Sequence, residues 1–112
     1  MDFQGTTVLV IGASGALGSV FAGELVSKGA TVLGTARTQS SAEKIPASVT
    51  TKLLLDLEVQ SSIDAVIDYL KDHTSDGVIN ASGVVGFGRA NETTAQDAEH
   101  LMQVNHLGPA AF

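Results

Sequence analysis

Three glycines, Gly12, Gly15 and Gly18, lie between the apolar run 8–11 and a helix-like stretch. A turn in this position presents backbone N–H groups and the positive end of a helix dipole to one point, where they can bind the pyrophosphate of a dinucleotide. Glycine spacing alone is a weak signal, because a helix-packing turn that binds nothing has the same glycines. The strand-like and helix-like flanks favour the nucleotide-binding interpretation.

The residues that follow the second apolar run indicate which dinucleotide is bound. Sites for NAD place a carboxylate there to accept the ribose hydroxyls. This chain instead has Ala36 followed by Arg37 and Thr38, and a guanidinium suits bidentate contact with a phosphate. Ser14 in the glycine turn offers a hydroxyl to the same 2′-phosphate. The sequence therefore predicts NADP(H) as the cofactor in preference to NAD(H).

Short apolar runs alternate with amphipathic stretches along the whole chain, which is typical of parallel strands joined by helical crossovers. Strands are expected over 6–11, 31–36, 49–55 and 77–80. Right-handed crossovers predict an α/β fold, a partial Rossmann fold whose parallel sheet has strand order 3-2-1-4 and helices on both faces. Residues 1–112 are expected to form one NADP-binding domain, with its cleft between the first and fourth strands.

The first predicted helix has an apolar face made of Leu17, Val20, Phe21 and Leu25, and it is expected to stop at Gly29. A later helix has the clearest stripe, which consists of Val59, Ile63, Val66, Ile67 and Leu70. Thr94 and Asp97 predict a capped start for the last helix. These helices would cover the two faces of the sheet.

Composition limits the partners that the chain can be expected to have. The 112 residues include 12 acidic and 6 basic side chains, a net charge of -6, which disfavours nucleic acid or an anionic membrane as the main partner. There is no cysteine, residues 1–4 lack the basic segment of a secretory signal, and no apolar run is long enough to span a bilayer. A cytoplasmic location is expected. His73, His100 and His106 are not spaced as a ligand set, so no metal site is predicted.

Four segments, in the expected order, resemble the short-chain dehydrogenase/reductase family. The glycine turn is similar to the family motif TGxxxGxG, with Ile11 in place of the threonine and Ala16 in place of the middle glycine. Taken as GxxGxxG, the same turn matches the variant found in the extended and atypical branches, so the branch stays open. Asp56 matches the acidic residue that bonds the adenine amino group in the family, and a helix cap is an equally good interpretation of the local sequence.

The stretch after the fourth predicted strand resembles the family motif NNAG and keeps its first Asn and its Gly, although a strand-ending turn also explains it. Together these arguments assign cofactor binding to Gly12, Ser14, Gly15, Ala16, Leu17, Gly18, Arg37, Thr38, Asp56, Leu57, Asn80, Ala81, Ser82 and Gly83.

The fourth segment, 104–109, resembles the VNxxGP motif, whose asparagine belongs to a Ser-Tyr-Lys-Asn catalytic set. A helical N–H at position 109 would bond the Asn105 carbonyl, but Pro109 has no N–H, so this carbonyl is left to hold a water. In the family such a water leads to the catalytic lysine, and Asn105 is therefore the predicted catalytic residue. The alternative is that Gly108 and Pro109 only bend or end the helix.

The resemblance implies an oxidoreductase that moves hydride between NADP(H) and a small-molecule carbonyl or secondary alcohol, in a homo-oligomer. The family's serine and Tyr-x-x-x-Lys pair would lie beyond Phe112, and Tyr69 is followed by His73 where that pair has lysine. The 112 residues alone are therefore expected to be inactive, and an uncovered fourth strand would make them marginally stable or self-associating. Two alternatives stay open: a non-catalytic nucleotide sensor or regulatory module, and an extended-type sugar-nucleotide epimerase or dehydratase.

Overall fold

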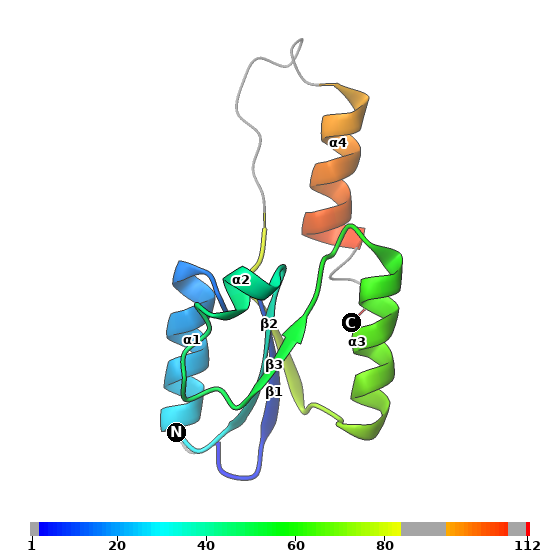
Figure 1. Ribbon diagram of the computed structural model, residues 1–112. Helices are drawn as coiled ribbons and strands as arrows, with labels where there is room; N and C mark the ends of the chain where they lie inside the picture. Colours follow the sequence, from blue (N-terminus) through cyan, green and yellow to red (C-terminus); the bar gives the residue numbers. More distant parts are fainter. Residues whose placement is uncertain (1–2, 84–93, 108–111) are drawn as a thin grey trace.

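A single parallel sheet organises the chain in the computed structural model, which describes residues 3–83, 94–107 and 112. Its strands are β1 (Thr7–Ile11), β2 (Thr31–Ala36), β3 (Thr51–Leu54) and β4 (Gly77–Asn80). They lie in the order β3-β2-β1-β4 (Figure 1). The predicted α/β fold and strand order are thus confirmed.

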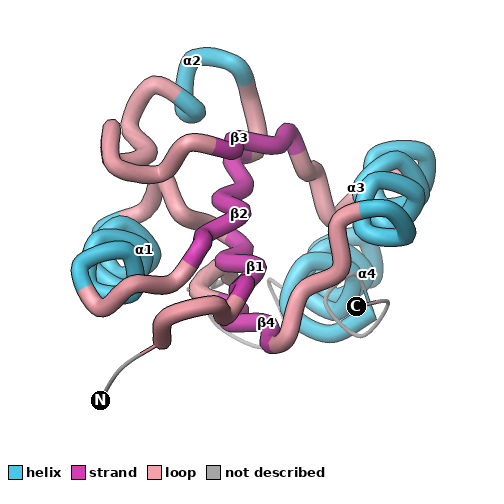
Figure 2. The backbone as a smooth tube through the Cα atoms, turned by 90° about the horizontal axis from the view of Figure 1, so that it is seen from below, coloured by secondary structure: helices cyan, strands magenta, loops and turns pink. Residues whose placement is uncertain are grey.

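Helices cover both faces of the sheet. α1 (Ala16–Ser27) and α2 (Gln39–Ala42) lie on one side, and α3 (Gln60–Asp72) lies on the other (Figure 2). α4 (Ala95–Met102) is on the side of α3 but rises beyond the carboxyl ends of the strands (Figure 1). α4 continues into a π-helical turn, Gln103–Leu107. None of the helices in the described part of the chain is long and apolar enough to cross a membrane.

Strand β1 is buried on both faces, which explains its unbroken apolar sequence. Val8 and Val10 belong to the apolar cluster under α1, whereas Leu9 and Ile11 belong to the cluster that includes Ile63 of α3. Successive side chains of a strand point to opposite faces, so one short run supplies both clusters. The core therefore holds the carboxyl end of β1, where the glycine turn begins, in a fixed position.

The predicted apolar face of α1 is wrong for three of its four residues. Leu17 and Val20 are each 60% exposed and Phe21 is 39% exposed. The buried side of the helix instead carries Gly18, Ala22 and Leu25. Small residues face inward because the first turn of α1 packs directly against the glycine turn, and bulky side chains would hold the helix away from it. The predicted stop is confirmed, since Gly29 has a φ of 96°.

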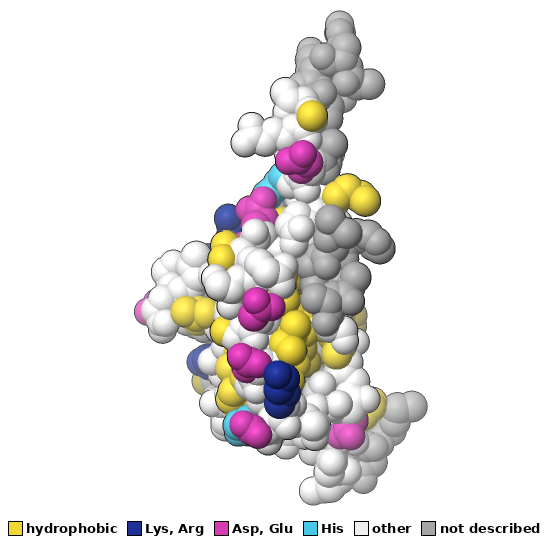
Figure 3. All heavy atoms as spheres, turned by 90° about the vertical axis from the view of Figure 1, so that its right-hand side faces the viewer, with side chains coloured by type: hydrophobic (Ala, Val, Ile, Leu, Met, Phe, Trp, Pro, Cys, Tyr) yellow, Lys and Arg dark blue, Asp and Glu magenta, His cyan; other side chains and the backbone are white. Residues whose placement is uncertain are grey.

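The remaining helices follow the predicted pattern more closely. Ile63 and Val66 of α3 are buried, and the acidic side chains of this helix are exposed on the face seen in Figure 3. α4 begins at Ala95, directly after the predicted cap residue Thr94, while the side chain of Asp97 lies outside the described part.

Phe112 lies outside any helix. It packs against the apolar cluster around Ile63.

Candidate functional site

A cleft of about 310 Å³ opens where the carboxyl ends of the strands meet. It is bounded by residues that follow each of the four strands and by His100 and Val104 at the α4 side. Parallel sheets gather their loops at this edge, which is where such folds bind ligands. Of the predicted cofactor residues, the cleft is lined by Gly12, Ser14, Gly15, Arg37, Asp56, Leu57, Ala81, Ser82 and Gly83.

The glycine turn requires glycine at two positions, because of its backbone conformation at Gly12 and because of its close packing at Gly18. Gly12 has a φ of 82°, and a Cβ there would lie 3.0 Å from the backbone nitrogen of Ser82. At Gly18 a Cβ would lie 2.0 Å from the Gly12 carbonyl oxygen, an overlap of backbone with backbone. Gly18 therefore lets the start of α1 approach the turn, and Gly12 lets the turn approach the residues that follow β4.

The start of α1 supplies donors beside this turn. The first intrahelical bond runs from the Ser19 N–H to the Gly15 carbonyl at 2.9 Å, so the N–H groups of residues 16–18 have no carbonyl partner within the helix. Together with the helix dipole, such amides favour an anion. The side chains of Ala16 and Leu17 are exposed and do not line the cleft, so any role for these residues is through the backbone.

Thr35 ties the glycine turn to strand β2, a residue that the sequence reasoning missed. The Gly12 N–H donates to Thr35 Oγ1 at 3.1 Å, and the Ala13 N–H donates to the Thr35 carbonyl at 2.9 Å. The Thr35 side chain is 1% exposed. A hydroxyl in an otherwise apolar buried strand is the signal that would have found it, because a buried hydroxyl needs a partner.

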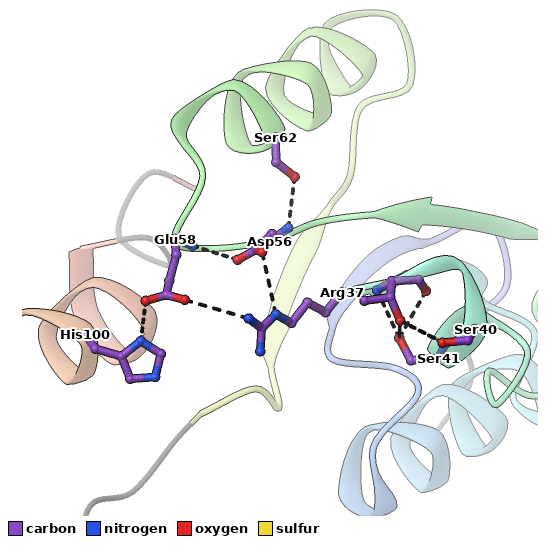
Figure 4. Close-up of polar contacts among 8 residues, drawn as sticks. Arg37, Ser40, Ser41, Asp56, Glu58, Ser62 and His100 are labelled. Atoms are coloured by element: carbon purple, nitrogen blue, oxygen red, sulfur yellow. Dashed lines mark hydrogen bonds and ion pairs between the residues drawn. The ribbon is translucent and has the colours of Figure 1, made fainter. Parts of the chain in front are cut away.

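Four charged or titratable side chains form a chain across the β3 end of the cleft (Figure 4). The Arg37 Nε lies 3.5 Å from Asp56 Oδ2, and Arg37 Nη2 lies 3.8 Å from Glu58 Oε2. His100 Nδ1 contacts the other oxygen of Glu58. The predicted cation Arg37 is therefore paired with two carboxylates. Glu58 and His100 were not predicted, because their meeting depends on how α4 sits over the loop after β3.

Asp56 stabilises the turn after β3 and also places a carboxylate oxygen at the cleft. Its Oδ1 accepts the Glu58 N–H at 3.0 Å, and its own N–H donates to Ser62 Oγ at 2.9 Å. Its second oxygen faces Arg37. The cap of α3 is Val59, so Asp56 stabilises the turn before the helix and is not the helix cap itself.

Two predicted residues have local partners and do not line the cleft. Thr38 forms a capping box with Ser41 at the start of α2, where its hydroxyl accepts the Ser41 N–H at 3.1 Å. Asn80 Oδ1 accepts from the N–H and the hydroxyl of Ser82, at 3.1 and 2.5 Å. The strand-ending turn considered for 80–83 is therefore present, and it shapes the wall made by Ala81 and Gly83.

Asn105 lies in the π-helical turn and faces the same wall. A Cβ built at Gly83 would lie 3.2 Å from Asn105 Oδ1, so the asparagine side chain packs against the end of β4. Val104 beside it lines the cleft, and the Gln103 side chain donates to the Leu57 carbonyl at 2.7 Å. The predicted effect of Pro109 on the Asn105 carbonyl lies outside the described residues.

Comparison with protein families matches residues 6–111 to the short chain dehydrogenase model. A 3-oxoacyl-(acyl-carrier-protein) reductase of Pseudomonas aeruginosa is 35% identical over 92 residues, which cover 75% of this chain and 37% of the relative. The NADPH-dependent pterin aldehyde reductase of Arabidopsis thaliana is 32% identical over 112 residues, 93% of this chain and 46% of the relative. The chain thus spans less than half the length of these curated relatives.

Solved structures give the same fold. A short-chain dehydrogenase/reductase from Serratia marcescens superposes with a TM-score of 0.87 at 23% sequence identity, covering 99% of this chain and 49% of that one. A double mutant of a Serratia marcescens short-chain dehydrogenase/reductase gives 0.88 at 22% identity with the same coverage. At a sequence identity of 22–23%, the structural similarity shows only that the fold is shared.

Proposed function

Since the chain belongs to the short-chain dehydrogenase/reductase family, we propose that residues 1–112 form the NADP(H)-binding Rossmann domain, or part of it, of an oxidoreductase acting on a small carbonyl compound or secondary alcohol. The observation that carries this proposal is the glycine turn, where Gly12 has a positive φ, Gly18 has no room for a Cβ, and the first amides of α1 lie beside the cleft. A pyrophosphate fits such a cradle.

The residues around the cleft can be given roles toward this cofactor. The amides at 16–18 would bind the pyrophosphate, and Arg37 would contact the 2′-phosphate. Asp56 would accept from the adenine amino group, and the walls at Leu57 and 81–83 would hold the rings. When bound, the nicotinamide would supply the hydride donor or acceptor. That one relative is named as NADPH-dependent supports the choice of NADP(H).

Titration with both cofactors tests the proposal in the full-length protein. NADPH at one hundred times its dissociation constant should stabilise the folded state by about 2.7 kcal/mol and raise the melting temperature by several degrees. NADH at the same concentration should give a smaller shift. Differential scanning fluorimetry would measure both. No shift with either nucleotide would contradict the proposal, and binding without carbonyl reduction would favour a nucleotide sensor.

Asn105 is proposed to position a water in the proton relay of the reaction. The variant Asn105→Ala should lower kcat about fivefold, since one hydrogen bond contributes about 1 kcal/mol. The dissociation constant of NADPH should change by less than about twofold. Met102→Ala, an exposed position on α4, is the matched control and should leave kcat unchanged. An equal fall in both variants would show that Asn105 acts only through the helix.

The remaining expectations stay predictions. They are a homo-oligomer, a cytoplasmic location, and the lack of turnover by the 112 residues alone.

A further inference from the structure

Glu58 lies at the centre of the charged groups at the β3 end of the cleft. One of its oxygens is 3.8 Å from Arg37 Nη2, and the other contacts His100 Nδ1 of α4 (Figure 4). The side chain of Glu58 is 32% exposed, whereas that of Arg37 is 65% exposed. The carboxylate is thus held from two sides, and the guanidinium reaches toward it from the end of β2.

The net charge at the β3 end of the cleft disfavours the binding of a further anion. Arg37 brings one positive charge, and Asp56 and Glu58 bring two negative charges within 4 Å of it. A phosphate that reached the guanidinium would have to displace a carboxylate or lie beside one. Asp56 is fixed by its bond to the Glu58 N–H and lies closer to Arg37, at 3.5 Å against 3.8 Å for Glu58. The contact between Arg37 and Glu58 is therefore the one that a phosphate would displace, while His100 still holds the other Glu58 oxygen.

We propose that Glu58 sets the discrimination between NADP(H) and NAD(H), because its carboxylate occupies the Arg37 guanidinium and lowers the affinity for a 2′-phosphate. This inference rests on the cofactor site proposed above. The 2′-hydroxyl of NAD(H) is uncharged and requires no exchange of ion pairs, so affinity for NAD(H) depends little on Glu58. The preference for NADP(H) over NAD(H) is therefore smaller than it would be if Arg37 faced the cleft without the Glu58 carboxylate.

The test uses two nucleotides that differ by the 2′-phosphate, 2′,5′-ADP and 5′-AMP, with calorimetry on the full-length protein at low ionic strength. Glu58→Gln keeps the shape of the side chain and removes its charge. It should raise the affinity for 2′,5′-ADP about three- to tenfold and change that for 5′-AMP by less than about twofold. Asp72→Asn, at the far end of α3, makes the same charge change away from the cleft and should alter neither affinity.

The same substitution, made in a variant that lacks the Arg37 guanidinium, shows whether Glu58 acts through Arg37. When Arg37 is first replaced by Gln, the gain from Glu58→Gln should disappear. A gain that persists there, an equal gain for both nucleotides, or no gain at all would overturn the inference. If the unmodified protein binds neither nucleotide, the proposed function fails and the inference falls with it. If it binds both and Glu58→Gln has no effect, the inference alone fails.

Discussion

Gly18→Ala should destabilise the protein by about 1–3 kcal/mol and weaken NADPH binding at least about tenfold. The new Cβ would lie 2.0 Å from the Gly12 carbonyl oxygen, and no side-chain rotation can relieve a contact between two backbone groups. The turn and α1 must move apart, which displaces the amides proposed to bind the pyrophosphate. Thermal unfolding followed by circular dichroism and an NADPH titration would measure the two effects.

The same helix offers a matched control. A Cβ at Gly23 would meet nothing within 4 Å. Gly23→Ala should therefore stabilise the protein by about 0.5–1 kcal/mol, the usual gain when alanine replaces glycine inside a helix. NADPH affinity should stay unchanged. If both alanine variants shift the melting temperature in the same direction, the close approach at Gly18 is not what holds the turn together.

Arg37→Asp should weaken NADP(H) binding about ten- to a hundredfold while changing NAD(H) binding by about twofold. The loss combines a hydrogen bond to a charged group, about 1.5–3 kcal/mol, with repulsion between the new carboxylate and the phosphate. The variant also removes the cation that faces Asp56 and Glu58. Fluorescence titrations with the two reduced cofactors would measure the ratio.

Lys71→Asp is the control for this charge reversal. Lys71 lies 3.1 Å from Asp68 on the exposed side of α3, so it too is a cation paired with a carboxylate, but not at the cleft. It should leave both affinities unchanged. Equal losses of NADPH and NADH binding in Arg37→Asp would remove the basis for assigning NADP(H) as the preferred cofactor.

Hydrophobic periodicity and the handedness of crossover connections were sufficient to predict the strands of the sheet and their order. The β-branched runs fixed β1, β2 and β4 to within one residue, and the handedness of crossovers fixed their order. β3 was expected from residue 49 but begins at Thr51. Val49 is 1% exposed and its N–H bonds to the Pro46 carbonyl, so an apolar residue buried by a turn resembled the start of a strand.

Hydrophobic periodicity predicted the wrong buried face for α1, because it selects the most hydrophobic side of a helix. The side of α1 that packs inward is determined by the small size of its side chains. Gly18 and Ala22 face inward although Leu17 and Val20 are more apolar. Only the three-dimensional contact between Gly18 and Gly12 reveals this requirement. The outward side of α1 therefore carries an apolar surface that the sequence pattern assigned to the interior.

The polar groups of the cleft were predicted where they follow strands and missed where they come from elsewhere. Arg37 was found because nucleotide sites place a charged residue after the second strand, and Asp56 was found because it matches an acidic residue of the short-chain dehydrogenase/reductase family. His100 comes from a helix whose docking on Glu58 and Leu57 depends on individual side chains. No local pattern in the sequence encodes such a meeting.

The charged residues that follow the strands tolerate substitution differently from the residues inside the core. Arg37 and Glu58 are not part of the apolar core, so substitutions there can change the proposed cofactor preference with little cost to folding. Thr35, like Gly18, is different, since one buried hydroxyl both completes a strand of the core and accepts the Gly12 N–H. A change at position 35 is therefore expected to disturb the core and the proposed cofactor turn together, whereas a change at Arg37 or Glu58 leaves the core intact.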